Sequence, residues 1–231
     1  MHWTDPLDGR PLRHARVWLD GTLWRASLIG ELDPVRLHAL AAWIGAGRAV
    51  VVRRRDPGFD AACCLGVAFP VSAERMRIGF AVDPLAIVRV EPPLELHDVL
   101  GHAPMAWRPA LQDLLDRAKQ SGTTFHVYGS LAWQAISGER CVRPRSDLDL
   151  LWSANTLDEV DRVLRLLTAW ESVSDLRADG ELLLPDGGAI AWRELKRSPD
   201  RVLVKHQDRV SLQPAAYWRS QYLQAPLAQQ A

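Results

Sequence analysis

The chain has 231 residues, of which 48% are hydrophobic and 24% are charged, so it has the composition of an ordinary globular protein with one large domain or two small ones. Its 28 basic and 28 acidic residues cancel to a formal net charge of zero, which argues against a protein whose main task is to coat nucleic acid. Three cysteines give no disulfide framework, and no run has the length of a membrane span or the form of a signal peptide, so we expect a reduced, cytoplasmic protein with no membrane partner.

The first 92 residues predict a small module rich in strands. Asp33 and Pro34 supply an N-cap and a first-turn proline for a helix that ends at Gly45 and buries Val35, Leu40, Trp43 and Ile44. Strands are expected at Val17–Leu19, Leu23–Ile29, Ala49–Val52, Ala61–Phe69 and Met76–Val82. Because paired prolines at 92 and 93 mark a boundary, we predict domains over 1–92 and 93–220, followed by a tail over 221–231.

The second domain alternates helices and strands. A helix over 109–120 precedes a buried strand, Phe125–Tyr128, and then Gly129 and Ser130 form a tight turn into a short helix that ends near Gly138. Thr156 and Glu159 form a capping box for the next helix. A hairpin of Glu181–Leu184 and Ala189–Leu195 follows, and the last strands are Val202–Lys205 and Arg209–Leu212. This order predicts an α+β fold with helices packed on a mixed sheet.

Asp147 and Asp149 stand out as candidate metal ligands. They alternate with Leu148 and Leu150, so in a strand both carboxylates point to one face while both leucines enter the core. Two carboxylates about 6–7 Å apart on one face are unfavourable unless a cation lies between them or water solvates the edge. Carboxylate oxygens suit Mg²⁺. We therefore predict Asp147 and Asp149 as catalytic, magnesium-binding residues, with a solvated strand edge as the alternative.

Gly129 and Ser130 are candidate phosphate-binding residues, because a turn that enters a helix presents free backbone N–H groups. Arg143 and Arg145, just before the aspartates, could neutralise polyphosphate charge or could be solvated loop residues. For a third carboxylate the first candidate is Glu194 on the second hairpin strand, followed by Asp179 and Glu181, with Asp186 the weakest. No P-loop and no GxGxxG motif is present.

A Gly-Ser turn followed by an acid-x-acid strand resembles the nucleotidyltransferase superfamily typified by DNA polymerase beta. Sixteen residues separate Ser130 from Asp147, a longer gap than the usual form has. The strings VYGSLAWQAISGERCVRPRSDLDLLW, ADGELLLPDGGAIAWRELK and VLVK are similar to one family in particular, the phosphoribosyl-dephospho-CoA transferases of malonate decarboxylase, also called malonate decarboxylase holo-acyl-carrier-protein synthases. RHARVWL, VVVRRR and RIGFAV are similar to the less specific N-terminal half of that family.

The resemblance implies a nucleotidyltransferase-like C-terminal domain and a defined reaction. The family takes 2'-(5''-triphosphoribosyl)-3'-dephospho-CoA and transfers its phosphoribosyl-dephospho-CoA part to a serine of the acyl-carrier subunit of malonate decarboxylase, with release of pyrophosphate. The two catalytic aspartates of the family fall on Asp147 and Asp149, which would hold Mg²⁺, while Gly129 and Ser130 would bind the triphosphate. The nucleophile then comes from the partner subunit.

Two other functions remain open at this stage. One is a different magnesium-dependent nucleotidyltransferase that acts on RNA or a small molecule, although the neutral charge balance counts against RNA. The other is a nucleotide-binding regulator without catalysis, against which the presence of both Asp147 and Asp149 argues.

Overall fold

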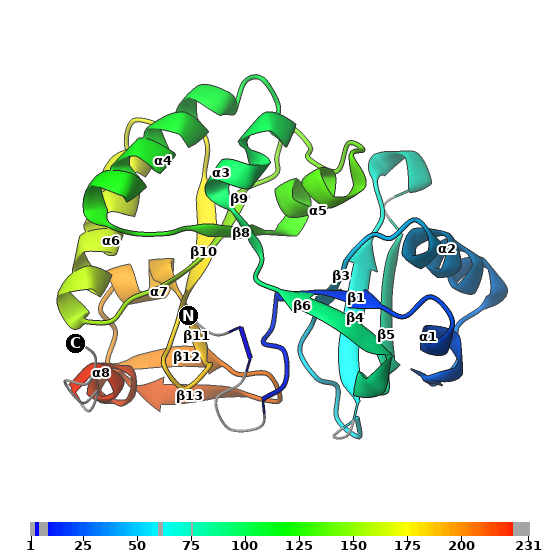
Figure 1. Ribbon diagram of the computed structural model, residues 1–231. Coiled ribbons are helices and arrows are strands. Elements are labelled where there is room, and N and C mark those ends of the chain that lie inside the picture. Colours follow the sequence, from blue (N-terminus) through cyan, green and yellow to red (C-terminus); the bar gives the residue numbers. More distant parts are fainter. Residues whose placement is uncertain (1–2, 5–8, 60–61, 75, 224–231) are drawn as a thin grey trace, which may run out of the picture.

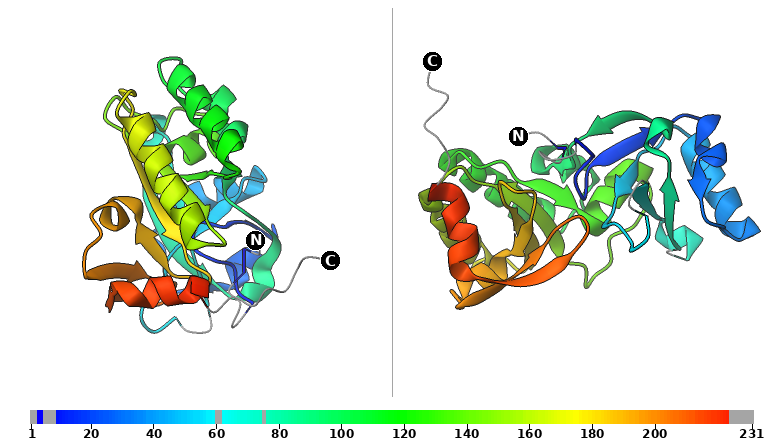
Figure 2. Two further views of the ribbon diagram at one scale, coloured as in Figure 1. Left: turned by 90° about the vertical axis from the view of Figure 1, so that its left-hand side faces the viewer. Right: turned by 90° about the horizontal axis from the view of Figure 1, so that it is seen from below.

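The structure is a computed structural model that describes residues 3–4, 9–59, 62–74 and 76–223. The chain forms two β-sheets, and it passes from the first to the second between Glu91 and Leu94 (Figure 1). The two sheets lie along the long axis of the molecule, with helix α2 (Pro34–Gly45) at one end and helix α8 (Ala215–Leu223) at the other (Figure 2).

The first sheet is antiparallel throughout and has the strand order β2-β5-β4-β3-β1-β6. Its strands are β1 (Arg16–Leu19), β2 (Leu28–Ile29), β3 (Val50–Val52), β4 (Cys63–Ala68), β5 (Arg77–Val82) and β6 (Ile87–Glu91). Helix α2 covers one face, and the Asp33 side chain caps it by accepting the Arg36 N–H at 3.0 Å, as its sequence predicts. Leu40 and Trp43 of α2 pack on that face, against Val50 and Leu65.

Two expectations for this half of the chain were wrong. Residues 23–26 form a helix, α1 (Leu23–Ala26), in place of a strand, because the Asp20 carboxylate accepts the backbone N–H groups of Thr22 and Leu23, each at 2.8 Å. Only Leu28 and Ile29 pair as a strand. Val35 is 71% exposed, because the first turn of α2 extends beyond the edge of the core.

The second sheet is mixed, with the strand order β13-β12-β11-β10-β9-β8-β7. Its strands are β7 (Leu94–Glu95), β8 (His126–Tyr128), β9 (Leu148–Ser153), β10 (Ala178–Leu183), β11 (Ala189–Ala191), β12 (Arg201–Lys205) and β13 (Val210–Pro214). Strands β9 and β10 are parallel, and the other neighbours are antiparallel. With helices packed on it, this sheet confirms the predicted α+β class with a mixed sheet.

Helices pack on this sheet and build the larger core. They are α3 (Leu96–Val99), α4 (Arg108–Ser121), α5 (Gly129–Ser137), α6 (Leu157–Glu171), α7 (Trp192–Lys196) and α8. Trp170 of α6 is fully buried and donates its indole N–H to the Ala110 carbonyl oxygen of α4 at 2.9 Å, which fixes the two helices against each other. Within the described residues, no helix is both long and apolar enough to cross a bilayer.

Three further expectations differ from the structure. Residues 192–195, expected as the end of a hairpin strand, belong to helix α7, because Trp192 and Leu195, at helical spacing, are both buried. The Thr156 hydroxyl accepts the Glu159 N–H at 3.2 Å, which is one half of the predicted capping box. The other half does not form, because the Glu159 carboxylate accepts the N–H of Asn155, at 2.7 Å, and not the N–H of Thr156. Residues 221–223, assigned to the tail, complete α8, and the rest of the predicted tail lies outside the described residues.

The N-terminal segment lies against the second sheet before it enters the first. Trp3 and Leu12 pack on Leu151 and Leu183 of strands β9 and β10. Next to this contact, Glu181 of β10 is buried and forms ion pairs with Arg13 and with Lys205, the latter at 2.8 Å. The same carboxylate lies 3.9 Å from His14 Nε2.

The electrostatic surroundings of Glu181 make it a stabilising group. Burial alone would raise its pKa, but His14, Arg13 and Lys205 outweigh burial and lower the pKa from 4.5 to about 2. A carboxyl with a lowered pKa in the folded state stabilises the fold above its unfolded pKa and loses that contribution as the pH falls towards 2. Glu181 therefore ties the N-terminal segment to β10 at neutral pH.

We predict that Glu181→Gln lowers the free energy of unfolding at pH 7 by about 3 kcal/mol, because it leaves two cations beside a neutral group. The difference from the unsubstituted protein should shrink between about pH 4.5 and pH 2. Urea denaturation at a series of pH values measures it, with the exposed Glu31→Gln as the control. A difference that stays constant over this pH range would contradict the assignment.

Candidate functional site

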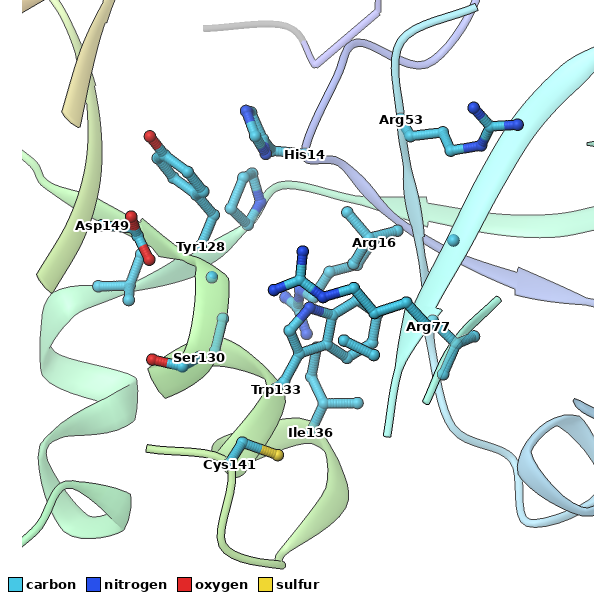
Figure 3. Close-up of a pocket in the computed structure, with 18 of the residues that line it drawn as sticks. His14, Arg16, Arg53, Arg77, Tyr128, Ser130, Trp133, Ile136, Cys141 and Asp149 are labelled. Carbon is cyan, nitrogen blue, oxygen red and sulfur yellow. The ribbon is translucent and has the colours of Figure 1, made fainter. Parts of the chain in front are cut away.

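A cavity of about 790 Å³ lies between the two sheets. All four residues predicted for the site line it: Gly129, Ser130, Asp147 and Asp149. Strands β3, β4 and β5 line it from the first sheet, and β8, α5 and the loop before β9 line it from the second. Figure 3 shows Tyr128, Ser130 and Asp149 on one side of this cavity, with the strand that carries Arg77 on the other. The structure thus brings the four residues together, and their roles stay predictions.

The turn from β8 into α5 is built around Gly129. Tyr128 pairs with Asp149 in the antiparallel register of β8 and β9, so the first residue of α5 lies directly against the Asp149 side chain. Gly129 has a φ of 67°, and a Cβ at this position would lie 1.8 Å from Asp149 Oδ2. Only glycine accommodates both the positive φ and the close carboxylate. The Ser130 N–H then donates to the Asp149 carboxylate.

Asp149 carries a strongly perturbed carboxyl group. Burial, followed by the negative charges of Asp179, Asp147 and Glu181, raises its pKa to about 7, although the hydrogen bond from Ser130 acts in the opposite direction. Asp147 lies at the more open end, with its side chain 40% exposed and Oδ2 3.9 Å from Arg177 Nε. Burial and the neighbouring carboxylates therefore both disfavour the ionised form of Asp149 when no cation is beside it.

This donor set fits a hard divalent cation. Carboxylate oxygens are the ligands that Mg²⁺ prefers, and it commonly takes one or two protein carboxylates together with substrate phosphates and water. Asp147 and Asp149 supply two such groups, and the raised pKa of Asp149 indicates negative charge that a cation would relieve. No three His, Cys, Asp or Glu side chains within the described residues converge as a metal cluster, so the protein would supply only part of the ligand shell.

The expected third acid, Glu194, lies elsewhere. It belongs to helix α7, and its Oε1 accepts the backbone N–H of Leu203 at 2.8 Å. Asp179 is the nearer acid, because it pairs in register with Asp149 on the adjacent parallel strand and so projects from the same face of the sheet. Glu181 is taken up by its ion pairs, and Asp186 accepts hydrogen bonds from Tyr217 and Gln221. Asp179 therefore replaces Glu194 as the candidate.

Arg143 and Arg145 both line the cavity, and neither side chain has a hydrogen-bond or ion-pair partner within the described residues. Other basic residues from the N-terminal half also line the cavity: Arg13, Arg16, Arg53, Arg54 and Arg77. Of these, the sequence had suggested only the run Arg53–Arg55 as a possible phosphate-binding group, with a solvated strand end as the favoured alternative.

His14 and Tyr128 form a buried pair at the side of the cavity. Their ring centroids are 4.2 Å apart. Burial lowers the pKa of His14, and burial together with the charges of Glu181, Asp149 and Asp179 raises the pKa of Tyr128. Burial therefore favours the neutral form of both side chains.

We predict that Gly129→Ala is far more damaging than Gly138→Ala at the other end of α5. Both glycines have a positive φ, but a Cβ at Gly138 would meet no atom within 4 Å. Gly138→Ala should cost about 1 kcal/mol in the free energy of unfolding, from backbone strain alone. Gly129→Ala should cost at least about 2 kcal/mol more, because the methyl group must displace Asp149. Urea denaturation measures both variants, and equal losses would contradict the proposed contact.

Comparisons with known proteins match nearly the whole chain. Residues 12–93 match the family described as the phosphoribosyl-dephospho-CoA transferase MdcG N-terminal domain, and residues 95–216 match its C-terminal domain. No solved structure gives a significant match.

Curated relatives agree with this assignment. A phosphoribosyl-dephospho-CoA transferase from Xanthomonas axonopodis pv. citri (strain 306) is 42% identical over 209 residues, which cover 88% of this chain and 94% of the relative. A protein of the same name from Bradyrhizobium diazoefficiens is 34% identical, over 89% of this chain and 91% of the relative. Another from Pseudomonas fluorescens (strain Pf0-1) is 30% identical, over 85% of this chain and 89% of the relative. The chain is therefore a transferase that belongs to the phosphoribosyl-dephospho-CoA transferase family.

Proposed function

We propose that this transferase moves the phosphoribosyl-dephospho-CoA group from its triphosphoribosyl precursor to a serine of the apo acyl-carrier subunit of malonate decarboxylase. The observation that carries the proposal is one cavity that combines the Asp147 and Asp149 carboxylates, the N-terminus of α5 and the side chains of Arg143 and Arg145. Such a cavity offers ligands for a cation and donors for phosphate oxygens side by side.

The reaction is a displacement at phosphorus. The serine oxygen of the carrier attacks the α-phosphate of the precursor, and a new phosphodiester bond forms. The bond from the α-phosphorus to the oxygen that bridges it to the β-phosphate breaks, so pyrophosphate leaves with that oxygen. The hydroxyl proton of the serine is released to solvent. No oxidant or reductant takes part.

The residues of this chain would bind and orient the reactants. Ser130, in the first turn of α5, would direct its hydroxyl and the positive end of the helix dipole at a phosphate. Arg143 and Arg145, without protein partners among the described residues, would neutralise the triphosphate. Asp147 and Asp149 would hold Mg²⁺, and Asp179, which pairs in register with Asp149, would add negative charge near them without completing a three-acid cluster. When bound, Mg²⁺ supplies charge stabilisation for the phosphate oxygens and the leaving group.

The competing functions predict different outcomes in one assay. A nucleotidyltransferase with a small-molecule acceptor would leave the carrier unmodified and would release pyrophosphate only when that acceptor is added. A regulator without catalysis would bind the precursor tightly and release no pyrophosphate. The cytoplasmic location expected from the sequence stays a prediction.

We predict that the protein, with Mg²⁺, the precursor and the apo carrier, increases the carrier mass by one phosphoribosyl-dephospho-CoA group and releases one pyrophosphate per carrier. Asp147→Asn and Asp149→Asn should each lower the rate by at least about 10³-fold, because both remove a carboxylate that would bind the cation. Mass spectrometry of the carrier and a coupled pyrophosphate assay measure both products. No mass gain, or a gain that both variants retain, would rule out the proposed reaction.

The third acid is tested in the same assay by a matched pair of variants. Asp179→Asn should lower the rate by about 10²-fold, because it removes a charge next to the proposed cation site. Glu194→Gln should leave the rate within about twofold, since its carboxylate faces the Leu203 amide. The opposite ranking would return the role to Glu194.

A further inference from the structure

The arginines of the cavity fall into two classes. Arg13, Arg16 and Arg53 form ion pairs with Glu181, Glu91 and Asp56, in that order. Arg54, Arg77, Arg143 and Arg145 also line the cavity, but none of them has an ion-pair or hydrogen-bond partner for its side chain within the described residues. The cavity therefore carries basic charge that no side chain among the described residues neutralises.

Arg77 differs from the other three because it comes from inside the first sheet. Arg54 follows the end of β3, and Arg143 and Arg145 lie in the loop before β9. Arg77 starts strand β5, where it pairs with Ala68 of β4, and its side chain is exposed. Figure 3 shows this side chain directed from the first sheet across the cavity, towards Trp133 of α5.

Two glycines beside Arg77 make room for the side chain of Arg53 on the sheet surface. Gly66 and Gly79 pair with each other on neighbouring strands, on the same face as Arg77. Neither has a positive φ, so backbone conformation does not explain them. A Cβ at Gly79 would lie 3.2 Å from Arg53 Nε. The glycines thus let Arg53 lie flat on the sheet, where the Leu65 carbonyl oxygen and the Asp56 carboxylate hold it.

Arg53 and Arg77 therefore differ in whether their guanidinium groups are bound by the protein. Arg53 has its guanidinium committed to protein acceptors, whereas that of Arg77 is available to a ligand in the cavity. A guanidinium presents two parallel donors that match two oxygens of a phosphate, and it does so best where water is partly excluded.

We propose that Arg77 binds a phosphate group of the transferred substrate, so that the first sheet forms one wall of the active site. This inference rests on the proposed function, because the precursor is the polyphosphate considered there. The precursor carries phosphate in two places, the triphosphate and the diphosphate of dephospho-CoA. Both present the same chemistry to Arg77, and the experiment separates them.

The test compares Arg77→Gln with Arg77→Lys in the complete protein. Arg77→Gln should raise KM for the precursor about tenfold or more, with a smaller change in kcat and an unchanged KM for the carrier. Arg77→Lys should recover part of the loss, since it keeps the charge but not the paired donors. Arg36→Gln, on α2 and outside the cavity, is the matched control and should behave like the unsubstituted protein.

Calorimetric binding of two fragments identifies the phosphate and does not depend on turnover. Weaker binding of tripolyphosphate to Arg77→Gln assigns Arg77 to the triphosphate, whereas weaker binding of dephospho-CoA assigns it to the diphosphate. If neither fragment affinity nor KM changes by more than about twofold, Arg77 is a solvated residue and the inference is wrong. If Arg77→Gln binds a fragment more weakly than the unsubstituted protein does, but the unsubstituted protein modifies no carrier, the proposed function is wrong and the phosphate site at Arg77 is still supported.

Discussion

The close contact between Gly129 and the Asp149 carboxylate is the constraint on which the site depends. Because residue 129 has no side chain, strand β8 can turn into α5 directly against β9, and the Ser130 N–H reaches the carboxylate. A larger residue would push the helix away from the strand and would also have to adopt a φ of 67°. The absence of a side chain at residue 129 therefore allows the N-terminus of α5 and the Asp149 carboxylate to lie next to each other in the cavity.

The direction of α5 then relates the two sheets. Its Trp133 and Ile136 pack on the core of the first sheet, and Trp133 meets Trp43 of α2 edge-on at 5.9 Å between ring centroids. On another side of the interface, the Arg55 N–H donates to the Gln207 carbonyl oxygen at 2.7 Å, and the Gln207 side chain donates to the Arg53 carbonyl oxygen at 2.8 Å. Together with the buried Glu181 ion pairs, these contacts fix the first sheet relative to the second, so that one face of the first sheet lies across the cavity from Asp149.

Local patterns predicted the centre of the site, and long-range packing decided the rest. The alternation around Asp147 and Asp149 and the Gly-Ser turn lie within 25 residues, so strand, turn and helix followed from the sequence. The position of Glu194 did not follow from the sequence, because residues 192–195 fit either a strand or a helix. The burial of Trp192 in the core favours the helix. The sequence suggested Arg53–Arg55 as a possible phosphate-binding run but could not show which arginines remain unpaired, because that depends on contacts between segments far apart in the chain, such as Arg13 with Glu181.

The charges that line the cavity argue for a polyphosphate ligand accompanied by a cation. Burial and then neighbouring acids raise the pKa of Asp149 to about 7, so both disfavour its ionised form when no cation is beside it. Arg77, Arg143 and Arg145 line the same cavity, and none of them has an acidic partner within the described residues. A polyphosphate that meets the arginines directly and the aspartates through a divalent cation would neutralise both sets of charges at once, and a neutral substrate would neutralise neither.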